Sequence, residues 1–267
     1  MKLLISGDIE GTCGINTWDE TGPNRDAFWY DYFRKQMTRE VAAACEGALA
    51  AGANDIIVKD AHATARNIIP SGLPREVRMS RGWAGDGFGM VTGIQNGVEA
   101  LAFTGYHCAA FTTGNPMSHT SNLTIEELTI NGLRTSEFVF YSYAAGMLGV
   151  PIVFLSGDAE ICAQAEELVP GIVTVPVVEG FGNSTVSPHP DVAAERIREG
   201  MERALKGDWQ SCRIKMPERF EVVLRYTTHA KANSMSLYPG AARIDAKTIG
   251  FKTDNYMDVL RFYSFVS

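Results

Sequence analysis

The sequence lacks the features that mark disulfide-stapled proteins. Its 267 residues include only five cysteines, an odd number, and no two of them form a C-x-x-C pair. An odd, scattered set of this kind does not form a disulfide framework and is typical of a reducing compartment. We therefore expect mostly buried thiols.

Long apolar runs are also absent. The longest candidate for a membrane span, residues 141–157, is interrupted by Ser142, Gly146, Gly149 and Pro151, and is typical of a helix followed by a strand. The apolar start of the chain is interrupted by Asp8 and Glu10 before the core of a secretory signal could form. These patterns predict a cytoplasmic protein with no membrane partner.

Positive charge is in deficit. Lysine and arginine number 24 against 31 aspartates and glutamates, which gives a net charge of −7. A mildly acidic chain lacks the basic surface that nucleic acids or anionic membranes require, so no nucleic-acid partner is expected. The 45% hydrophobic and 21% charged residues are ordinary for a globular protein of this length, which can bury a sizeable core.

Short apolar runs alternate with helical patterns along the first two-thirds of the chain. Buried strands are expected at residues 2–6, 55–58, 76–80, 101–104, 123–130, 151–155 and 172–178, and helices at 26–51, 136–148 and 158–168. Strands that alternate with helices indicate parallel β-α-β units. The predicted fold is α/β, with a mostly parallel sheet flanked by helices in a Rossmann-like layering.

A stretch with several prolines and glycines, residues 180–190, is the best candidate for a domain boundary. It predicts a metal-binding α/β domain at 1–182 and a smaller α+β unit at 183–267. A helix at 191–205, strands at 220–226 and near 244–250, and a terminal helix from Asp254 would make up the second unit.

Carboxylates and imidazoles follow several of the predicted strands. Asp8 and Glu10 come after the first, His62 after the second, and His107 after the strand that ends at residue 104, with His119 a little further on. Ligands of open α/β sheets collect at the carboxyl ends of the strands. This mixture of oxygen and imidazole ligands suits Zn²⁺, Mn²⁺ or Fe²⁺ better than Ca²⁺ or Cu⁺.

The spacing of Asp8 and Glu10 strengthens the metal hypothesis. In an extended chain, residues two apart project on the same side, and two adjacent carboxylates repel unless a cation or a proton lies between them. In two-metal sites, whose ions lie about 3.5–4 Å apart, one carboxylate can bridge both ions.

Each residue of this set also has an ordinary structural explanation. Asp8 could cap a turn, Glu10 could be solvated, and His107 could be a buried imidazole with its hydrogen bonds satisfied. Taken together, the metal hypothesis is favoured because three of the five histidines lie at or soon after strand ends. His189 and His229 do not, and neither receives a role.

Other features favour structural explanations or stay open. The glycine-rich run 81–89 matches no phosphate-binding motif and is expected to be a flexible loop or a close backbone contact. Cys13 and Cys108 lie near the predicted site, but scattered cysteines of this kind are more often packing residues than nucleophiles. Three aromatic side chains could line a substrate pocket or simply fill the core: Trp29, Trp83 and Phe88.

Several short motifs, in the same order along the chain, resemble the DppA-type zinc-dependent D-aminopeptidase family. The matching segments are Asp8 to Gly11 with Gly14 behind it, Asp60 to His62, Gly105 to His107, Met117 to His119, Ile130 to Gly132 leading to Glu137, and Gly157 with Asp158. The resemblance runs from residue 1 to about residue 180 and more faintly beyond.

This resemblance implies a metallo-aminopeptidase that removes the N-terminal residue of short peptides or aminoacyl amides, with a preference for D-residues. It implies two zinc ions per subunit and a homo-oligomer that forms a ring. It implies a catalytic imidazole at His119 and metal ligands at Asp8, Glu10, His62, His107 and Glu137. Spacing alone would not have selected Glu137 over Glu126 or Glu127. The segment 118–137, rich in threonine and serine, does not match the family's pocket residues.

Two other functions stay open on the residues alone. A two-metal phosphoesterase would use the same ligands and would need a cation for the phosphate, for which Arg81 and Lys59 are candidates. A peptide-binding or transport-accessory protein without enzymatic activity would need a cleft but no metal.

Overall fold

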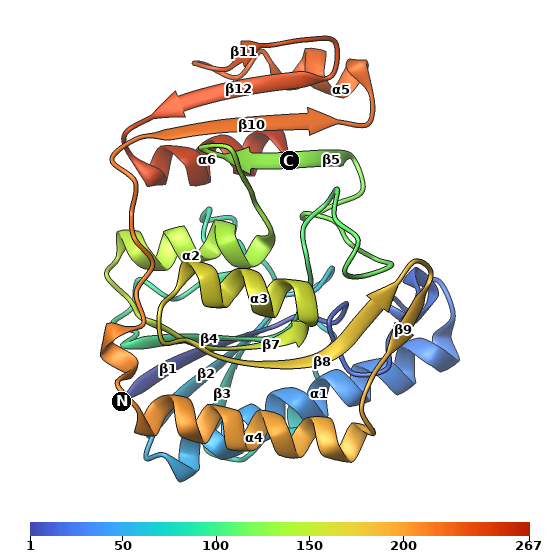
Figure 1. The fold of residues 1–267 in the computed structure, drawn as a ribbon, viewed down its shortest axis with the longest axis vertical. Helices are drawn as coiled ribbons and strands as arrows, with labels where there is room; N and C mark the ends of the chain where they lie inside the picture. The colour runs from blue at the N-terminus through green and yellow to red at the C-terminus, as the bar shows by residue number, and fades with distance from the viewer.

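The computed structural model describes residues 1–267 and contains two β-sheets with helices packed between and outside them (Figure 1). The larger sheet has the strand order β3-β2-β1-β4-β7-β8-β9 and is parallel except for β9, which pairs antiparallel with β8. Its strands are β1 (Lys2–Gly7), β2 (Asp55–Asp60), β3 (Val77–Ser80), β4 (Ala100–Tyr106), β7 (Ile152–Asp158), β8 (Val173–Phe181) and β9 (Ser184–Val186). The predicted α/β fold with a mostly parallel sheet is confirmed.

The smaller sheet is antiparallel and has the order β11-β12-β10-β5-β6. Its strands are β5 (Ile125–Ile130), β6 (Leu133–Arg134), β10 (Phe220–Tyr226), β11 (Ala242–Arg243) and β12 (Thr248–Thr253). β5 carries the strand expected at 123–130, but it pairs with β10 instead of joining the parallel sheet. The two sheets therefore do not divide the chain at residue 182, and a domain boundary there stays a prediction.

The helices form layers on both faces of the parallel sheet (Figure 1). α1 (Ala27–Ala50) and α4 (Pro190–Lys206) lie side by side on one face, and α2 (Glu137–Met147) and α3 (Ala159–Leu168) lie between the sheets. α6 (Tyr256–Val266) packs against the inner side of the smaller sheet, and α5 (His229–Met235) lies at that sheet's outer end. None of the helices combines the length and the apolar character needed to span a membrane.

Burial on both faces explains the composition of the central strands. Every residue of β4 and β7 is buried, as expected for parallel strands that are covered by helices on each side. One apolar core fills the space between α1, α4 and the parallel sheet, and the other fills the space between the two sheets.

Side-chain N-caps define the first residues of α1 and α2. The Asp26 side chain accepts hydrogen bonds from the backbone N–H groups of Phe28 and Trp29, and Ser136 accepts one from Val139, as expected for N-caps. Glu137 follows Ser136 in the first turn of α2.

Candidate metal centre

The carboxyl ends of three neighbouring strands bring the predicted site residues together. β2, β1 and β4 are adjacent in the parallel sheet, and His62, Asp8 and His107 follow within two residues of their respective ends. Glu10 lies in the same loop as Asp8. Because parallel strands present their carboxyl ends at one edge, segments distant in sequence meet at this edge.

One cluster consists of Asp8, Glu10 and His62. The Nδ1 atom of His62 lies 3.3 Å from Asp8 Oδ1 and 3.1 Å from Glu10 Oε2. All three side chains are buried, and their ligand atoms lie close enough to hold one ion. Glu10 is only 1% exposed, so the explanation of Glu10 as a solvated glutamate is wrong.

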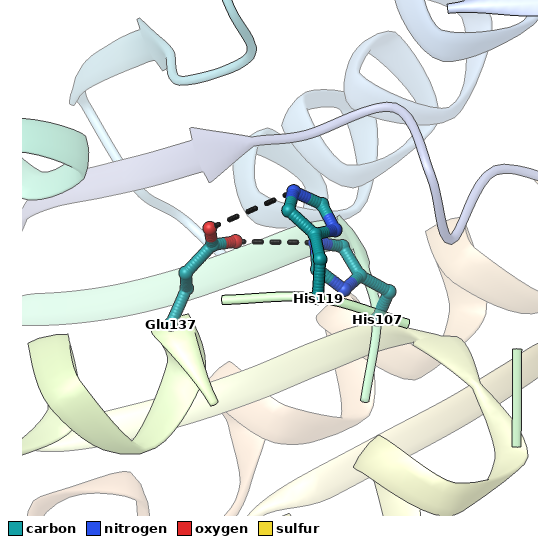
Figure 2. Close-up of side chains that lie close together, drawn as sticks. All are labelled: His107, His119 and Glu137. Atoms are coloured by element: carbon teal, nitrogen blue, oxygen red, sulfur yellow. Dashed lines mark ion pairs between the residues drawn. The ribbon is translucent and has the colours of Figure 1, made fainter. Parts of the chain in front are cut away.

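A second cluster consists of His107, His119 and Glu137 (Figure 2). The Nε2 atom of His107 lies 3.1 Å from Glu137 Oε2, and the Nε2 atom of His119 lies 4.0 Å from Glu137 Oε1. The two imidazole rings stack at a centroid distance of 4.3 Å. Glu137 reaches this cluster from the start of α2.

Asp8 connects the two clusters. Its Oδ1 atom faces His62, whereas its Oδ2 atom lies 3.6 Å from His107 Nε2. A carboxylate with one oxygen toward each group has the arrangement of a ligand that bridges two ions.

The hydrogen bonds of the three histidines direct one nitrogen of each ring toward the centre. His62 Nε2 lies 2.8 Å from the Thr21 carbonyl, His107 Nδ1 lies 2.9 Å from the Cys108 carbonyl, and His119 Nδ1 lies 3.0 Å from the Met117 carbonyl. A carbonyl can only accept, so each of these nitrogens carries a proton. In a neutral ring the opposite nitrogen then carries a lone pair that faces the site, as in histidines that bind metals.

Two buried atoms of the centre have no hydrogen-bond partner, Glu10 Oε2 and His107 Nε2. Buried polar atoms without a partner are costly, at roughly 1–3 kcal/mol each. Carboxylate oxygens and imidazole lone pairs that face one another at such distances are stabilised by a cation between them. The donor set of oxygen and nitrogen atoms fits a borderline divalent ion such as Zn²⁺.

Without a cation, protons are held at the same positions. Burial, together with repulsion from Glu10, raises the pKa of Asp8 to about 8. Burial lowers the pKa of His107, but attraction to Glu137 outweighs it and raises that pKa to about 10. His62 follows the same pattern, since Glu10 and Asp8 outweigh burial and hold its pKa well above the usual value. The site thus attracts positive charge.

The pKa of His119 moves the other way. Burial and repulsion from His107 lower it, and attraction to Glu137 does not compensate. His119 is therefore the imidazole of this centre that favours the neutral form, with its Nε2 atom unprotonated.

Glycines allow the loops to approach closely. A side chain at Gly11 would place its Cβ 1.9 Å from the Tyr106 carbonyl oxygen, and one at Gly105 would come within 2.3 Å of the Asp8 carbonyl oxygen. Gly105 also has a φ of +69°, which glycine adopts without strain. The segments that follow β1 and β4 can therefore bring Asp8 and His107 together.

Buried polar residues outside the clusters hold these loops in place. Asp60 accepts hydrogen bonds from the backbone of Asn67 and Ile68, and Asn67 in turn donates to the His62 carbonyl. Both oxygens of Asp60 are occupied in this way, since Oδ1 accepts from the Asn67 amide. Asp60 therefore orients the His62 loop.

Asn115 links three segments of the site. Its amide donates to the Glu10 carbonyl at 2.9 Å and lies 3.3 Å from Asp158 Oδ2, and its oxygen accepts from the Met117 N–H. Asp158 accepts from the Cys108 N–H, next to His107. No local pattern in the sequence indicates this role, because all of its partners except Met117 are distant along the chain.

The clusters open into a cavity of about 890 Å³. Trp83 lines this cavity, so of the two roles considered for it, pocket wall or core residue, the structure supports the pocket wall. The glycine-rich run also contributes Gly85, Gly87 and Gly89 to the wall. Other wall residues carry no sign of this position in the sequence, among them Trp18, Arg25, Leu123 and Phe265. The rings of Trp18 and His119 pack in a T-shaped contact, with ring centroids 4.9 Å apart.

The lysine, arginine and cysteine candidates from the sequence are not part of the two clusters. Lys59 is fully buried, and its ammonium group donates to the Gly82 carbonyl at 2.6 Å and lies 4.3 Å from the Trp83 ring centroid. Neither Lys59 nor Arg81 lines the cavity, so neither can meet a phosphate there. All five cysteines are buried and unpaired, and burial raises the pKa of Cys13 to about 12, which agrees with packing roles.

Comparison with known proteins places this geometry among the D-aminopeptidases. The family model described as D-aminopeptidase, peptidase family M55, matches residues 1–265. A D-aminopeptidase of Bacillus subtilis (strain 168) is 27% identical over 262 residues, which cover 97% of this chain and 93% of the relative. The solved structure of the Zn-dependent D-aminopeptidase DppA from Bacillus subtilis, described as a self-compartmentalizing protease, superposes with a TM-score of 0.92. That match is 24% identical and covers 100% of this chain and 96% of the other, which shows a shared fold.

Proposed function

The chain belongs to the D-aminopeptidase family and is a metallo-aminopeptidase; from this premise we propose that it removes N-terminal D-residues from short peptides or aminoacyl amides at a centre of two zinc ions. The observation that supports this proposal is the convergence of six buried carboxylate and imidazole side chains, of which all but His107 line one cavity. Neither alternative function is favoured. The cations suggested for the phosphoesterase, Lys59 and Arg81, do not line the cavity, and the family match is to aminopeptidases. A simple binding protein has no need of these ligands.

The two clusters suggest how the ligands are divided. Asp8, Glu10 and His62 would hold one ion, and His107 and Glu137 would hold the other, with Asp8 between them. Zinc held there would act as a Lewis acid on the scissile carbonyl and supply a nucleophile at neutral pH. The similarity to a zinc-dependent relative supports zinc over manganese or iron.

His119 is proposed as the general acid and base. Its Nδ1–H donates to the Met117 carbonyl, so that Nε2 points into the site as a free lone pair. Contact with Trp18 and with the ring of His107 fixes the orientation of the imidazole. A neutral Nε2 can take a proton from the attacking group and return it to the departing amine.

Location and assembly follow from the same reasoning. Five buried, unpaired thiols support a cytoplasmic location. The similar structure is described as self-compartmentalizing, which supports a homo-oligomer, and we propose a ring that encloses the active sites.

Metal analysis combined with stereochemical assays tests the function. Purified protein should contain two zinc ions per chain, and the zinc-loaded protein should release ammonia from a D-aminoacyl amide faster than from its L-isomer. Removal of zinc with a chelator should abolish both reactions, and added zinc should restore them. Release of phosphate from an aryl phosphate without cleavage of any amide would instead establish the phosphoesterase.

A further inference from the structure

The charges on the cavity wall are strongly unbalanced. Four side-chain carboxylates line it: Asp8, Glu10, Asp86 and Glu137. Arg25 is the only lysine or arginine among the lining residues. A substrate that carries a negative group therefore has one lysine or arginine on this wall to attract that group.

Arg25 is held in a defined position. Its guanidinium carbon lies 5.7 Å from the ring centroid of Trp18, which is the distance of a cation–π contact. Its backbone N–H donates to the Gly22 carbonyl, and the next residue, Asp26, is the N-cap of α1. The same loop reaches the metal centre through the Thr21 carbonyl, which accepts from His62.

The guanidinium forms no hydrogen bond and no ion pair within the chain. The Arg25 side chain takes part in none of the ion pairs and none of the side-chain hydrogen bonds. It is exposed and lines the cavity. Arg39 of α1 differs in this respect, since it pairs with Asp191. All five N–H donors of Arg25 are thus free to bind a ligand.

We propose that Arg25 binds the C-terminal carboxylate of the peptide substrate, and so selects short peptides with a free carboxyl end. This inference rests on the proposed aminopeptidase function and adds to it a preference for substrates with a free carboxyl end. Arginine matches a carboxylate through two parallel N–H···O bonds, which gives direction as well as charge.

The separation of His119 and Arg25 suits a short peptide. The Trp18 ring centroid lies 4.9 Å from that of His119 and 5.7 Å from the guanidinium carbon of Arg25, so His119 and Arg25 are at most about 11 Å apart. An extended peptide advances by about 3.3–3.6 Å per residue. With the scissile bond beside His119, the carboxylate of a dipeptide or a tripeptide therefore lies within reach of the guanidinium.

Matched acid and amide substrates test this proposal. The probes are D-alanyl-glycine and D-alanyl-glycyl-glycine, each beside its C-terminal amide, with the zinc-loaded full chain. Arg25→Gln should lower kcat/KM for the better of the two acids by about 10- to 100-fold, chiefly through KM, because a charge-assisted hydrogen-bond pair is lost. The same substitution should change kcat/KM for the matching amide by no more than about threefold, and Arg25→Lys should recover part of the loss.

Arg219→Gln is the control, since Arg219 is exposed and lies directly before β10, outside the cavity. This substitution should leave kcat/KM unchanged for both the acid and the amide. Equal losses of Arg25→Gln on acid and amide, or no loss on either, would overturn the proposal. If the wild-type chain cleaves none of the probes, the proposed function fails, and calorimetric titration with the same acids and amides still decides whether Arg25 binds the carboxylate.

Discussion

Glu40 provides a test of how burial controls the loop beneath the metal centre. It lies in α1, is 1% exposed, and accepts hydrogen bonds from the backbone N–H of Cys13 and from the Gln36 amide. Cys13 follows Glu10 in the same loop, so Glu40 anchors a segment that carries a proposed ligand. Its second oxygen, Oε2, has no partner.

Burial raises the pKa of Glu40 from 4.5 to about 7, and the hydrogen bonds from Gln36 and Cys13 offset only part of this rise. Between these two pH values the folded state holds a proton that the unfolded state has lost. The free energy of unfolding should therefore fall as the pH rises from about 4.5 to about 7 and level off above. At about 1.36 kcal/mol per pKa unit, the decline due to Glu40 amounts to about 3 kcal/mol.

Glu40→Gln removes this ionisation while it keeps an oxygen for the Cys13 N–H. Relative to the wild type, the variant should gain about 3 kcal/mol of stability between pH 4.5 and pH 8, measured by urea unfolding of metal-free protein at several pH values. Glu46→Gln changes an exposed glutamate of the same helix, and its free energy of unfolding should depend on pH in the same way as that of the wild type. Parallel curves for Glu40→Gln would show that Glu40 ionises normally and that the reasoning is wrong.

Three further predictions concern the metal centre. His119→Ala should lower turnover by roughly 10²- to 10⁴-fold with the zinc content unchanged by elemental analysis, whereas loss of zinc would make His119 a ligand. Asp8→Ala should lose zinc from both clusters, because its two oxygens face His62 and His107, and full zinc occupancy in this variant would refute the bridging role. Zinc binding at pH 7 should release protons, since His62 and His107 have raised pKa values in the metal-free state and must lose a proton to bind; calorimetry in two buffers of different ionisation enthalpy measures the number, and a value of zero would contradict this account.

The residues that follow strand ends were recognisable in the sequence because the signal is local. An apolar run that stops at a glycine or a carboxylate marks the end of a buried strand, and parallel strands end at one edge. The order of residues along the chain was therefore enough to predict that Asp8, His62 and His107 meet. Glu137 required the resemblance to a family, because its position in the first turn of α2 gives no sign of the direction it faces.

Other parts of the site depend on contacts between distant segments. Asn115 joins the loops of Glu10, Met117 and Asp158. The role proposed for Arg25 depends on the absence of any other lysine or arginine from the cavity wall. Lys59 follows the pattern of a residue at the sheet edge, yet its side chain is buried beneath Trp83. Hydrogen-bond partners and side-chain directions of this kind are set by packing, which sequence spacing does not encode.

The order of the amino acids was sufficient for the class of fold, the set of carboxylates and imidazoles, and the family, because periodicity, strand ends and short motifs are properties of neighbouring residues. Packing in three dimensions selected the nitrogen of each histidine that faces the centre, placed Asp8 between two clusters, and paired β5 with β10 outside the parallel sheet. These features arise where segments distant along the chain meet, because burial and the need to satisfy every polar atom leave a single arrangement there.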